Sequence, residues 1–172
     1  MGFYDVIEKR RSIREYIPGK PIPDDVLNRI LEAGRCAPSA SNRQPWKFLA
    51  IRDDNLRQRV CGCYRGEWLK SAPVILVVIG YRDQAWIRQK DSHCSLEVDL
   101  TIAMDHMILA AAAENIGSCW IMAFDYDFLA DVLELNENQF VSCITPLGYA
   151  EESALDAPKS SRKKFEEVAE II

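Results

Sequence analysis

The chain has 172 residues, of which 48% are hydrophobic and 27% charged, a composition that excludes disordered and fibrous proteins. That length suits a single domain over residues 1–172, or one that completes its core against a second copy of itself. The 21 basic and 26 acidic residues give a net charge of −5, which argues against nucleic acid or an anionic membrane as a partner.

In its first half the chain mixes short helices and strands. Pro23 is followed by two carboxylates, a combination that favours the first turn of a helix. In chain order we expect a helix over Phe3–Lys9, a helix from Pro23 to about Arg35, an ordered polar loop over Ala37–Pro45, a strand over Trp46–Arg52 and a helix over about Asn55–Cys63.

The second half begins with a continuous apolar run, Pro73–Tyr81, which predicts a buried central strand. A long helix over Ser95–Asn115 follows, because its apolar residues recur at helical spacing and Gly117 comes after it as a stop. We then expect strands over Ser118–Ala123 and Phe140–Tyr149, a short helix over about Tyr126–Leu133 between them, and a charged C-terminal segment over Ser160–Ile172. Since strands and helices do not alternate regularly, the fold class is α+β.

No segment of the sequence indicates secretion or membrane insertion. The most apolar stretch, Ile102–Ile116, contains Asp105, His106 and Glu114, each costly in lipid. We therefore expect a cytoplasmic protein with reduced thiols. Six cysteines without a CxxC pair and only two histidines give little support for a metal site, so we expect none.

The motifs of several enzyme classes are missing from the sequence. It contains no GxGxxG, GxxxxGK[ST], GxSxG or HExxH, which disfavours a Rossmann dinucleotide fold, a P-loop, an α/β-hydrolase and a zinc protease. An enzyme with this sequence would take its reactive group from an organic cofactor.

The strongest functional signal is the run Arg10-Arg11-Ser12-Ile13-Arg14. Guanidinium groups bind phosphate in a bidentate manner, and a serine hydroxyl adds a neutral donor. If the run is extended, Ser12 and Arg14 lie on the same face and can touch two parts of one elongated ligand. Taken alone, the run is more typical of a solvated basic patch, because basic clusters are common on protein surfaces.

Two further segments carry polar groups that suit a ligand. The loop Pro38–Gln44 combines hydroxyls and amides, which match the donor and acceptor edge of an isoalloxazine ring but also serve ordinary loop turns. The cluster Ser161-Arg162-Lys163-Lys164 is basic within an acidic chain, although a soluble tail has the same character.

In this combination and order the sequence resembles the nitroreductase family of FMN-dependent enzymes, particularly its short-chain members. The resemblance covers nearly the whole chain and rests on Arg10–Arg14, Ala37–Phe48, Gly117–Ile121, Thr145–Tyr149 and Arg162–Glu167. It implies a central mixed, mostly antiparallel sheet flanked by helices, in an intertwined homodimer with FMN at the interface.

The resemblance also implies a role for each matching residue. Arg10 and Ser12 match residues that bind the FMN phosphate, helped by Arg162 and by Lys163 or Lys164, while Arg11 is a cofactor-site residue without a specific role. Arg14 matches a catalytic position beside flavin N1 and O2. Residues matching those around the pyrimidine ring and ribityl chain are Pro38, Ser39, Ser41, Asn42 and Gln44. Either Met122 or Ala123 matches the catalytic backbone donor to flavin N5.

The activity implied is transfer of electrons from NAD(P)H through FMN to a nitroaromatic, quinone or similar small aromatic acceptor. Tyr64–Leu69 and Tyr81–Gln89 are the segments expected to cover the substrate. Three alternatives stay open: a flavoenzyme of the same fold with other chemistry, such as reductive dehalogenation or flavin breakdown; a non-enzymatic flavin-binding module; and a redox or metal protein that works through Cys61 and Cys63.

Overall fold

The structure is a computed structural model that describes residues 2–156 and 160–172. One antiparallel sheet of four strands lies at its centre, in the order β1-β2-β6-β5. These strands are β1 (Trp46–Ile51), β2 (Val74–Tyr81), β6 (Gln139–Gly148) and β5 (Gly117–Ser118). The α+β class with a mostly antiparallel sheet is thereby confirmed, and isolated bridges extend the sheet, including a parallel one between Ser12 and Ser118.

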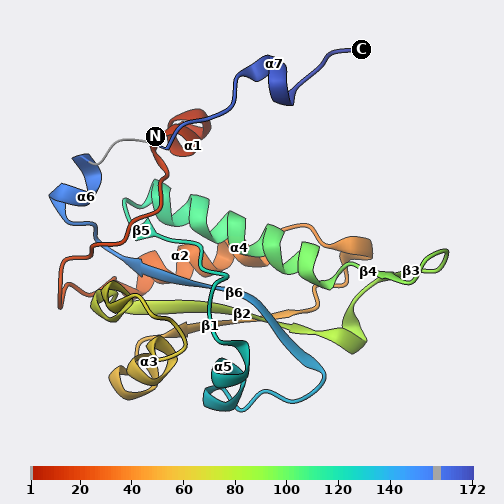
Figure 1. Cartoon of the computed structure of the whole chain (residues 1–172), viewed down its shortest axis with the longest axis horizontal. Helices are drawn as coiled ribbons and strands as arrows, with labels where there is room; N and C mark the ends of the chain where they lie inside the picture. The colour runs from red at the N-terminus through yellow and green to blue at the C-terminus, as the bar shows by residue number, and fades with distance from the viewer. Residues whose placement is uncertain (1, 157–159) are drawn as a thin grey trace.

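Strand β2 divides the core into two layers because successive side chains point to opposite faces of the sheet. Val74, Leu76 and Val78 face a cluster covered by α2 (Asp24–Arg35) and α4 (Leu96–Ala113). The alternate residues Ile75, Val77 and Ile79 face the second cluster, under α3 (Asp54–Cys61) and α5 (Tyr126–Val132). Figure 1 shows the resulting three layers, with helices on both faces of the sheet.

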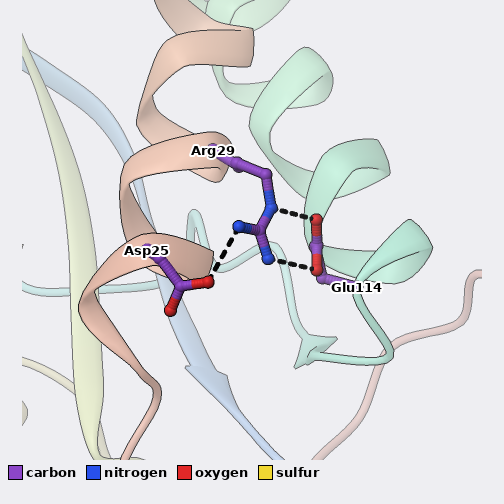
Figure 2. Close-up of polar contacts among 3 residues, drawn as sticks. All are labelled: Asp25, Arg29 and Glu114. Atoms are coloured by element: carbon purple, nitrogen blue, oxygen red, sulfur yellow. Dashed lines mark hydrogen bonds and ion pairs between the residues drawn. The ribbon is translucent and has the colours of Figure 1, made fainter.

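Helices α2 and α4 pack closely against each other over one face of the sheet. Gly34 permits this approach, since a Cβ at that position would lie 2.7 Å from Cγ of Met107. At the middle of α2 the Arg29 guanidinium donates to both carboxylate oxygens of Glu114, at 2.6 and 3.0 Å, and to Asp25 at 2.9 Å (Figure 2). This exposed ion triad joins α2 to the C-terminal end of α4.

The third layer depends on side-chain caps at the starts of its helices. Asp53 accepts a hydrogen bond from the N–H of Leu56 at the start of α3, and Asp125 accepts one from the N–H of Phe128 at the start of α5. Capping bonds of this kind satisfy backbone N–H groups of the first helical turn, which have no hydrogen-bond partner within the helix.

The strand expected over Ser118–Ala123 is much shorter in the structure. After β5 the chain meets β6 only through the bridge between Ile121 and Ile144. The N–H of Asp125 then donates to the carbonyl of Cys63 at 2.8 Å, so Met122 and Ala123 leave the sheet toward α3 and α5. The local sequence pattern does not predict this long-range contact.

Several small elements were not expected from the sequence. They are the 3-10 turns η1 (Ala40–Asn42), η2 (Glu67–Ser71) and η3 (Arg82–Gln84), the hairpin of β3 (Ile87–Arg88) and β4 (His93–Cys94), and the helices α6 (Glu152–Asp156) and α7 (Phe165–Val168). The first helix, α1 (Phe3–Lys9), has the bounds expected for it.

Both ends of the chain carry apolar side chains that are exposed to solvent. Phe3 and Tyr4 on α1 are exposed, as are Phe165 and Val168 on α7. In Figure 1 the C-terminal segment runs beyond the body of the molecule. Within the described residues, none of the helices combines the length and hydrophobicity needed to cross a bilayer.

Candidate functional site

The run that follows α1 lies along the edge of the sheet beside β5. Ser12 forms a parallel bridge with Ser118, and the N–H of Ile13 donates to the Ser118 carbonyl at 2.8 Å. Ile13 is only 3% exposed and Tyr16 only 2%, whereas Ser12 and Arg14 are exposed. The segment therefore buries Ile13 and Tyr16 and leaves the side chains of Ser12 and Arg14 accessible.

Tyr16 holds the end of this run in place. Its buried hydroxyl donates to the Ile13 carbonyl at 2.8 Å, and its ring lies 6.4 Å from that of Trp68. Burial raises the pKa of Tyr16 well above its ordinary value, so the phenol stays a neutral donor. The backbone between Ser12 and Tyr16 is thus fixed by a contact within the run itself.

Cys119 lies against the accessible face of the run. Its thiol is buried, and burial raises its pKa, while the guanidinium of Arg14, the hydroxyl of Ser12 and the charge of Arg10 act in the opposite direction. Ser12 and Arg14 therefore share one microenvironment with Arg10 nearby. Because its pKa is raised, the thiol is a neutral packing group there rather than a nucleophile.

Arg10 and Arg14 differ from Arg11 in what they contact. Neither Arg10 nor Arg14 forms an ion pair with any residue that the structure describes, although the chain is acidic overall. The Nη1 of Arg11 instead donates to the Leu155 carbonyl at 2.6 Å, which ties the run to α6. Arg10 and Arg14 thus keep their charge available for an anion, while Arg11 has a structural contact.

Met122 and Ala123 follow the edge strand and are both exposed, Met122 to 60%. Their backbone N–H groups donate to no described residue, while the preceding N–H of Ile121 donates to Ile144 at 3.0 Å. Two adjacent backbone donors are therefore without an acceptor among the described residues at the point where the chain leaves the sheet. This geometry is compatible with a donor to a bound ring.

The polar loop Pro38–Gln44 is ordered by an unusual backbone. Ser41, Asn42 and Gln44 have φ values of 51°, 53° and 51°, in the left-handed region that side chains disfavour. Ser39 stabilises the turn, since its Oγ accepts from the N–H of Gln44 at 2.9 Å. The Asn42 and Gln44 side chains are exposed, and Gln44 Nε2 donates to Asn42 Oδ1 at 3.2 Å.

Within one chain the loop and the run Arg10–Arg14 lie at opposite ends of α4. The N–H of Ala40 donates to Asp99, near the start of α4, whereas Ser12 pairs with Ser118, just beyond its end. The helix from Asp99 to Ala112 is about 20 Å long at 1.5 Å per residue. The two predicted groups of cofactor residues therefore do not meet in a single chain.

The C-terminal basic residues are also apart from the rest of the site. Arg162 is exposed and donates only to the carbonyls of Ser160 and Ser161, among the contacts described for it. Lys163 is likewise exposed. The structure does not bring either residue to Arg10 or Ser12.

A cavity that the sequence did not reveal lies beside the polar loop. It has a volume of about 260 Å³ and is bounded by the loop, by the first turns of α4 and by the segment that carries β3 and β4. Its lining consists of Pro38, Ser39, Ala40, Trp86, His93, Ser95, Val98, Asp99 and Ile102. Trp86 belongs to a segment expected to cover the substrate.

Sequence reasoning also missed Asp99. It occupies a buried position of α4, between Leu96 and Leu100 and in the same periodic row as Ala103. A carboxylate in an apolar helical row is a detectable signal, because burial of such a group requires specific partners. Among the described residues there is no cluster of three or more His, Cys, Asp or Glu side chains that would hold a metal ion.

The sequence matches the family profile described as "Nitroreductase family" over residues 7–61 and 60–149. The chain belongs to the nitroreductase family.

Individual relatives are similar to this chain over most of their length. A protein of Archaeoglobus fulgidus, named provisionally as an NADH dehydrogenase/NAD(P)H nitroreductase, is 30% identical over 84% of this chain and 83% of its own. A crystal structure from Desulfovibrio desulfuricans, titled provisionally as a nitroreductase in complex with FMN, has a TM-score of 0.83 at 28% identity and covers 100% and 98% of the two chains. The iodotyrosine deiodinase of Thermotoga neapolitana is 23% identical over 91% of this chain and 93% of its own.

Proposed function

We propose that this nitroreductase-family protein binds FMN and transfers electrons from NAD(P)H to a small aromatic acceptor such as a nitroaromatic or quinone. The observation that carries the proposal is the accessible face formed by Ser12 and Arg14, with Arg10 beside it. Neither Arg10 nor Arg14 forms an ion pair with a described residue. FMN-type cofactors supply the hydride and electron chemistry for which these side chains have no group of their own.

The phosphate of FMN fits the beginning of this face. Arg10 and Ser12 offer a guanidinium fork and a hydroxyl, donors that suit phosphate oxygens. Arg162 and Lys163 would add charge if the C-terminal segment of a bound complex lies closer than it does here. Arg11, held by Leu155, would support the backbone of the run.

The ring system fits the continuation of the same face. Arg14 would stabilise negative charge at the N1 and O2 edge of reduced flavin, because a fixed cation favours the state that carries the charge. The N–H of Met122 or that of Ala123, neither of which donates to a described residue, would donate to N5. Solvent can supply the protons, so no side chain is required as a general acid.

The loop Pro38–Gln44 supports a site shared between two chains. We expect Asn42 and Gln44 to contact the same pyrimidine edge as Arg14, yet about 20 Å of helix separates the two groups in one chain. A homodimer in which the loop of one protomer meets the run Arg10–Arg14 of its partner would satisfy both assignments. The cavity of about 260 Å³ beside the loop would then adjoin the flavin and accommodate part of the acceptor.

One relative favours a second candidate function. The similarity to an iodotyrosine deiodinase supports a flavoenzyme that reduces a halogenated phenol rather than a nitro group or quinone. Both reactions would use the same FMN contacts, so the acceptor is the point on which they differ.

Anaerobic reduction and reoxidation of the purified protein tests the proposal. The protein should be yellow, its flavin should be bleached by NADH or NADPH, and a quinone or nitroaromatic should restore the colour. Reoxidation only by an iodinated phenol would select the second candidate, and a flavin that neither nicotinamide reduces would indicate a binding module. A colourless protein that cannot be reconstituted with FMN would contradict every flavoprotein assignment.

Variants of Arg10 and Ser12 test the phosphate contacts. Either Arg10→Ala or Ser12→Ala should weaken FMN retention about tenfold, the equivalent of one lost charge-assisted hydrogen bond. Arg59→Ala is a matched control, because Arg59 is an exposed arginine on α3 to which no role is assigned. Equal retention in all three variants would contradict the phosphate assignment.

A further inference from the structure

Asp99 carries a buried carboxyl group near the start of α4. The residue is only 2% exposed. Its Oδ2 accepts a hydrogen bond from the Ser95 hydroxyl at 2.7 Å, and its Oδ1 accepts one from the N–H of Ala40 at 2.9 Å. No arginine, lysine or histidine in the described parts of the chain forms an ion pair with it. Its polar partners are therefore the first turn of its own helix and the polar loop.

The loop depends on this contact for its attachment to the body of the protein. Most of its other hydrogen bonds are internal, such as those from the N–H of Asn42 to the Ser39 carbonyl and from the N–H of Gln44 to Ser39 Oγ, both 2.9 Å. The N–H of Trp46, in the adjoining strand β1, also donates to the Gln44 carbonyl at 2.8 Å. Beyond that adjoining strand, the bond from Ala40 to Asp99 is the one hydrogen bond between residues 38–44 and the rest of the described chain.

The backbone of the loop also makes an anchor necessary. Three of its residues hold left-handed φ values, a conformation that persists only where surrounding contacts impose it. The internal bonds of the loop begin at Ser39 and Ala40, so the bond that fixes Ala40 also sets the direction in which Asn42 and Gln44 point. An apolar side chain at position 99 would fill the same space without that bond.

We propose that Asp99 is a positioning residue for the flavin site, holding the polar loop in the conformation that presents Ser39, Asn42 and Gln44 to the cofactor. This inference rests on the proposed function, in which those residues contact the flavin ring. Asp99 and Ala40 also line the cavity of about 260 Å³ beside the loop. Release of the loop would therefore change both the cofactor contacts and the wall of the acceptor cavity.

Two substitutions at position 99 separate the hydrogen bond from the carboxyl charge. Asp99→Ala removes both acceptor oxygens. Asp99→Asn keeps one oxygen for the N–H of Ala40, and the Ser95 hydroxyl can rotate to accept from the new amide. We expect the dissociation constant of FMN to rise about tenfold in Asp99→Ala and to change less than about threefold in Asp99→Asn.

Met107→Ala is the matched control on the same helix. Met107 is fully buried and packs against Gly34 of α2, away from the loop. The Met107→Ala substitution should lower Tm while leaving FMN affinity and the KM for the acceptor unchanged. Asp99→Ala should raise that KM by a larger factor than it lowers kcat. Equal loss of FMN affinity in Met107→Ala and Asp99→Ala would overturn the proposal, because destabilisation of α4 would then account for both.

Limited proteolysis tests the anchor without any cofactor. Trypsin can cut after Arg43, an exposed residue inside the loop. In flavin-free protein this cut should be several times faster in Asp99→Ala than in wild type, Asp99→Asn or Met107→Ala. If Asp99→Ala does not fold, Ala40→Pro removes the same bond from the loop side, since the ψ of 158° at Ser39 already suits a following proline.

The two proposals fail in different ways. Wild-type protein that binds no FMN overturns the proposed function, and the proteolysis of flavin-free protein still measures whether Asp99 anchors the loop. Wild-type protein that binds FMN, together with an Asp99→Ala variant that binds it equally well and resists trypsin at Arg43, overturns the role of Asp99 alone.

Discussion

Arg14 projects from the edge of the sheet beside Cys119 and forms no ion pair with a residue that the structure describes. Ser12 is exposed like Arg14, and both side chains lower the pKa of the Cys119 thiol, so the two lie close together. This proximity was predicted from the sequence, by alternation along a strand. The neighbouring Cys119 was not, because it lies more than a hundred positions away in the chain.

Replacement of Arg14 by leucine should lower the midpoint potential of bound FMN. Loss of one hydrogen bond to a charged group costs about 1.5–3 kcal/mol, which for a two-electron couple corresponds to about 30–60 mV. In Arg14→Lys the midpoint potential of bound FMN should stay close to that of the wild type, since lysine retains the positive charge. Anaerobic titration against dyes of known potential measures both variants, and an unchanged potential in Arg14→Leu would contradict the role assigned to Arg14.

The cysteines do not favour the alternative of thiol-based redox chemistry. Cys61 and Cys63 are buried in the core, and burial raises the pKa of Cys63 to about 12. The pKa of Cys61 is raised for the same reason. Thiols that stay protonated at neutral pH are poor nucleophiles, so these residues are packing groups at the end of α3.

At the scale of elements, the close approach of α2 and α4 determines where the loop and α4 meet. The side chain of Met107 occupies the space that a Cβ at position 34 would need. The bounds of both helices were close to those predicted, because apolar periodicity and helix-start residues are local signals. Their contact at Gly34 is tertiary and has no local signal.

Gly34→Ala should destabilise the protein by about 1 kcal/mol net. Overpacking against Met107 costs about 1–3 kcal/mol, and the better helix propensity of alanine offsets about 1 kcal/mol of that. Met107→Ala alone should cost about 2–5 kcal/mol by opening a cavity, which the added methyl group would partly fill in the double variant. In urea unfolding, the free-energy loss of the double variant should therefore differ from the sum of the losses of the two single variants. Equality of the two would show that the residues do not touch.

The ion triad that joins the same two helices predicts a pH effect (Figure 2). Arg29 lowers the pKa of Glu114 and of Asp25, so their pairing stabilises the fold above the ordinary carboxyl pKa near 4 and is lost as pH falls below it. Arg29→Gln should lower Tm slightly at pH 7, and the difference should shrink as pH falls through the lowered pKa values of the two carboxyls, and also in high salt. A difference that persists in acid or salt would contradict an electrostatic origin.

At the scale of the whole molecule, the exposed ends of the chain are the feature that a single copy leaves unexplained. Phe3 and Tyr4 on α1 and Phe165 and Val168 on α7 present apolar surface to water. Exposed apolar side chains that gather in a patch are typical of an interface. The exposure of these residues accords with the homodimer that we propose.

Deletion of residues 165–172 should shift the protein from dimer toward monomer in sedimentation velocity and weaken FMN retention with it. The deletion keeps Arg162 and Lys163, so loss of a phosphate contact would not explain the effect. The full-length variant Phe165→Ser/Val168→Ser should reproduce it, because the same apolar contacts are removed. A dimer that tolerates both changes would show that the C-terminal segment is not part of the interface.

The sequence by itself determined the α+β class, the positions of the longer helices and strands, and the residue types that suit a flavin. Those features depend on periodicity, capping residues and short motifs, all of which act over a few neighbouring residues. Only the tertiary structure decided that Arg11 turns to Leu155, that Met122 and Ala123 leave the sheet, and that the loop and the run Arg10–Arg14 lie at opposite ends of α4. The bond from Ala40 to Asp99 spans 59 residues, and packing of α4 on the sheet, rather than any local preference, brings its two ends together.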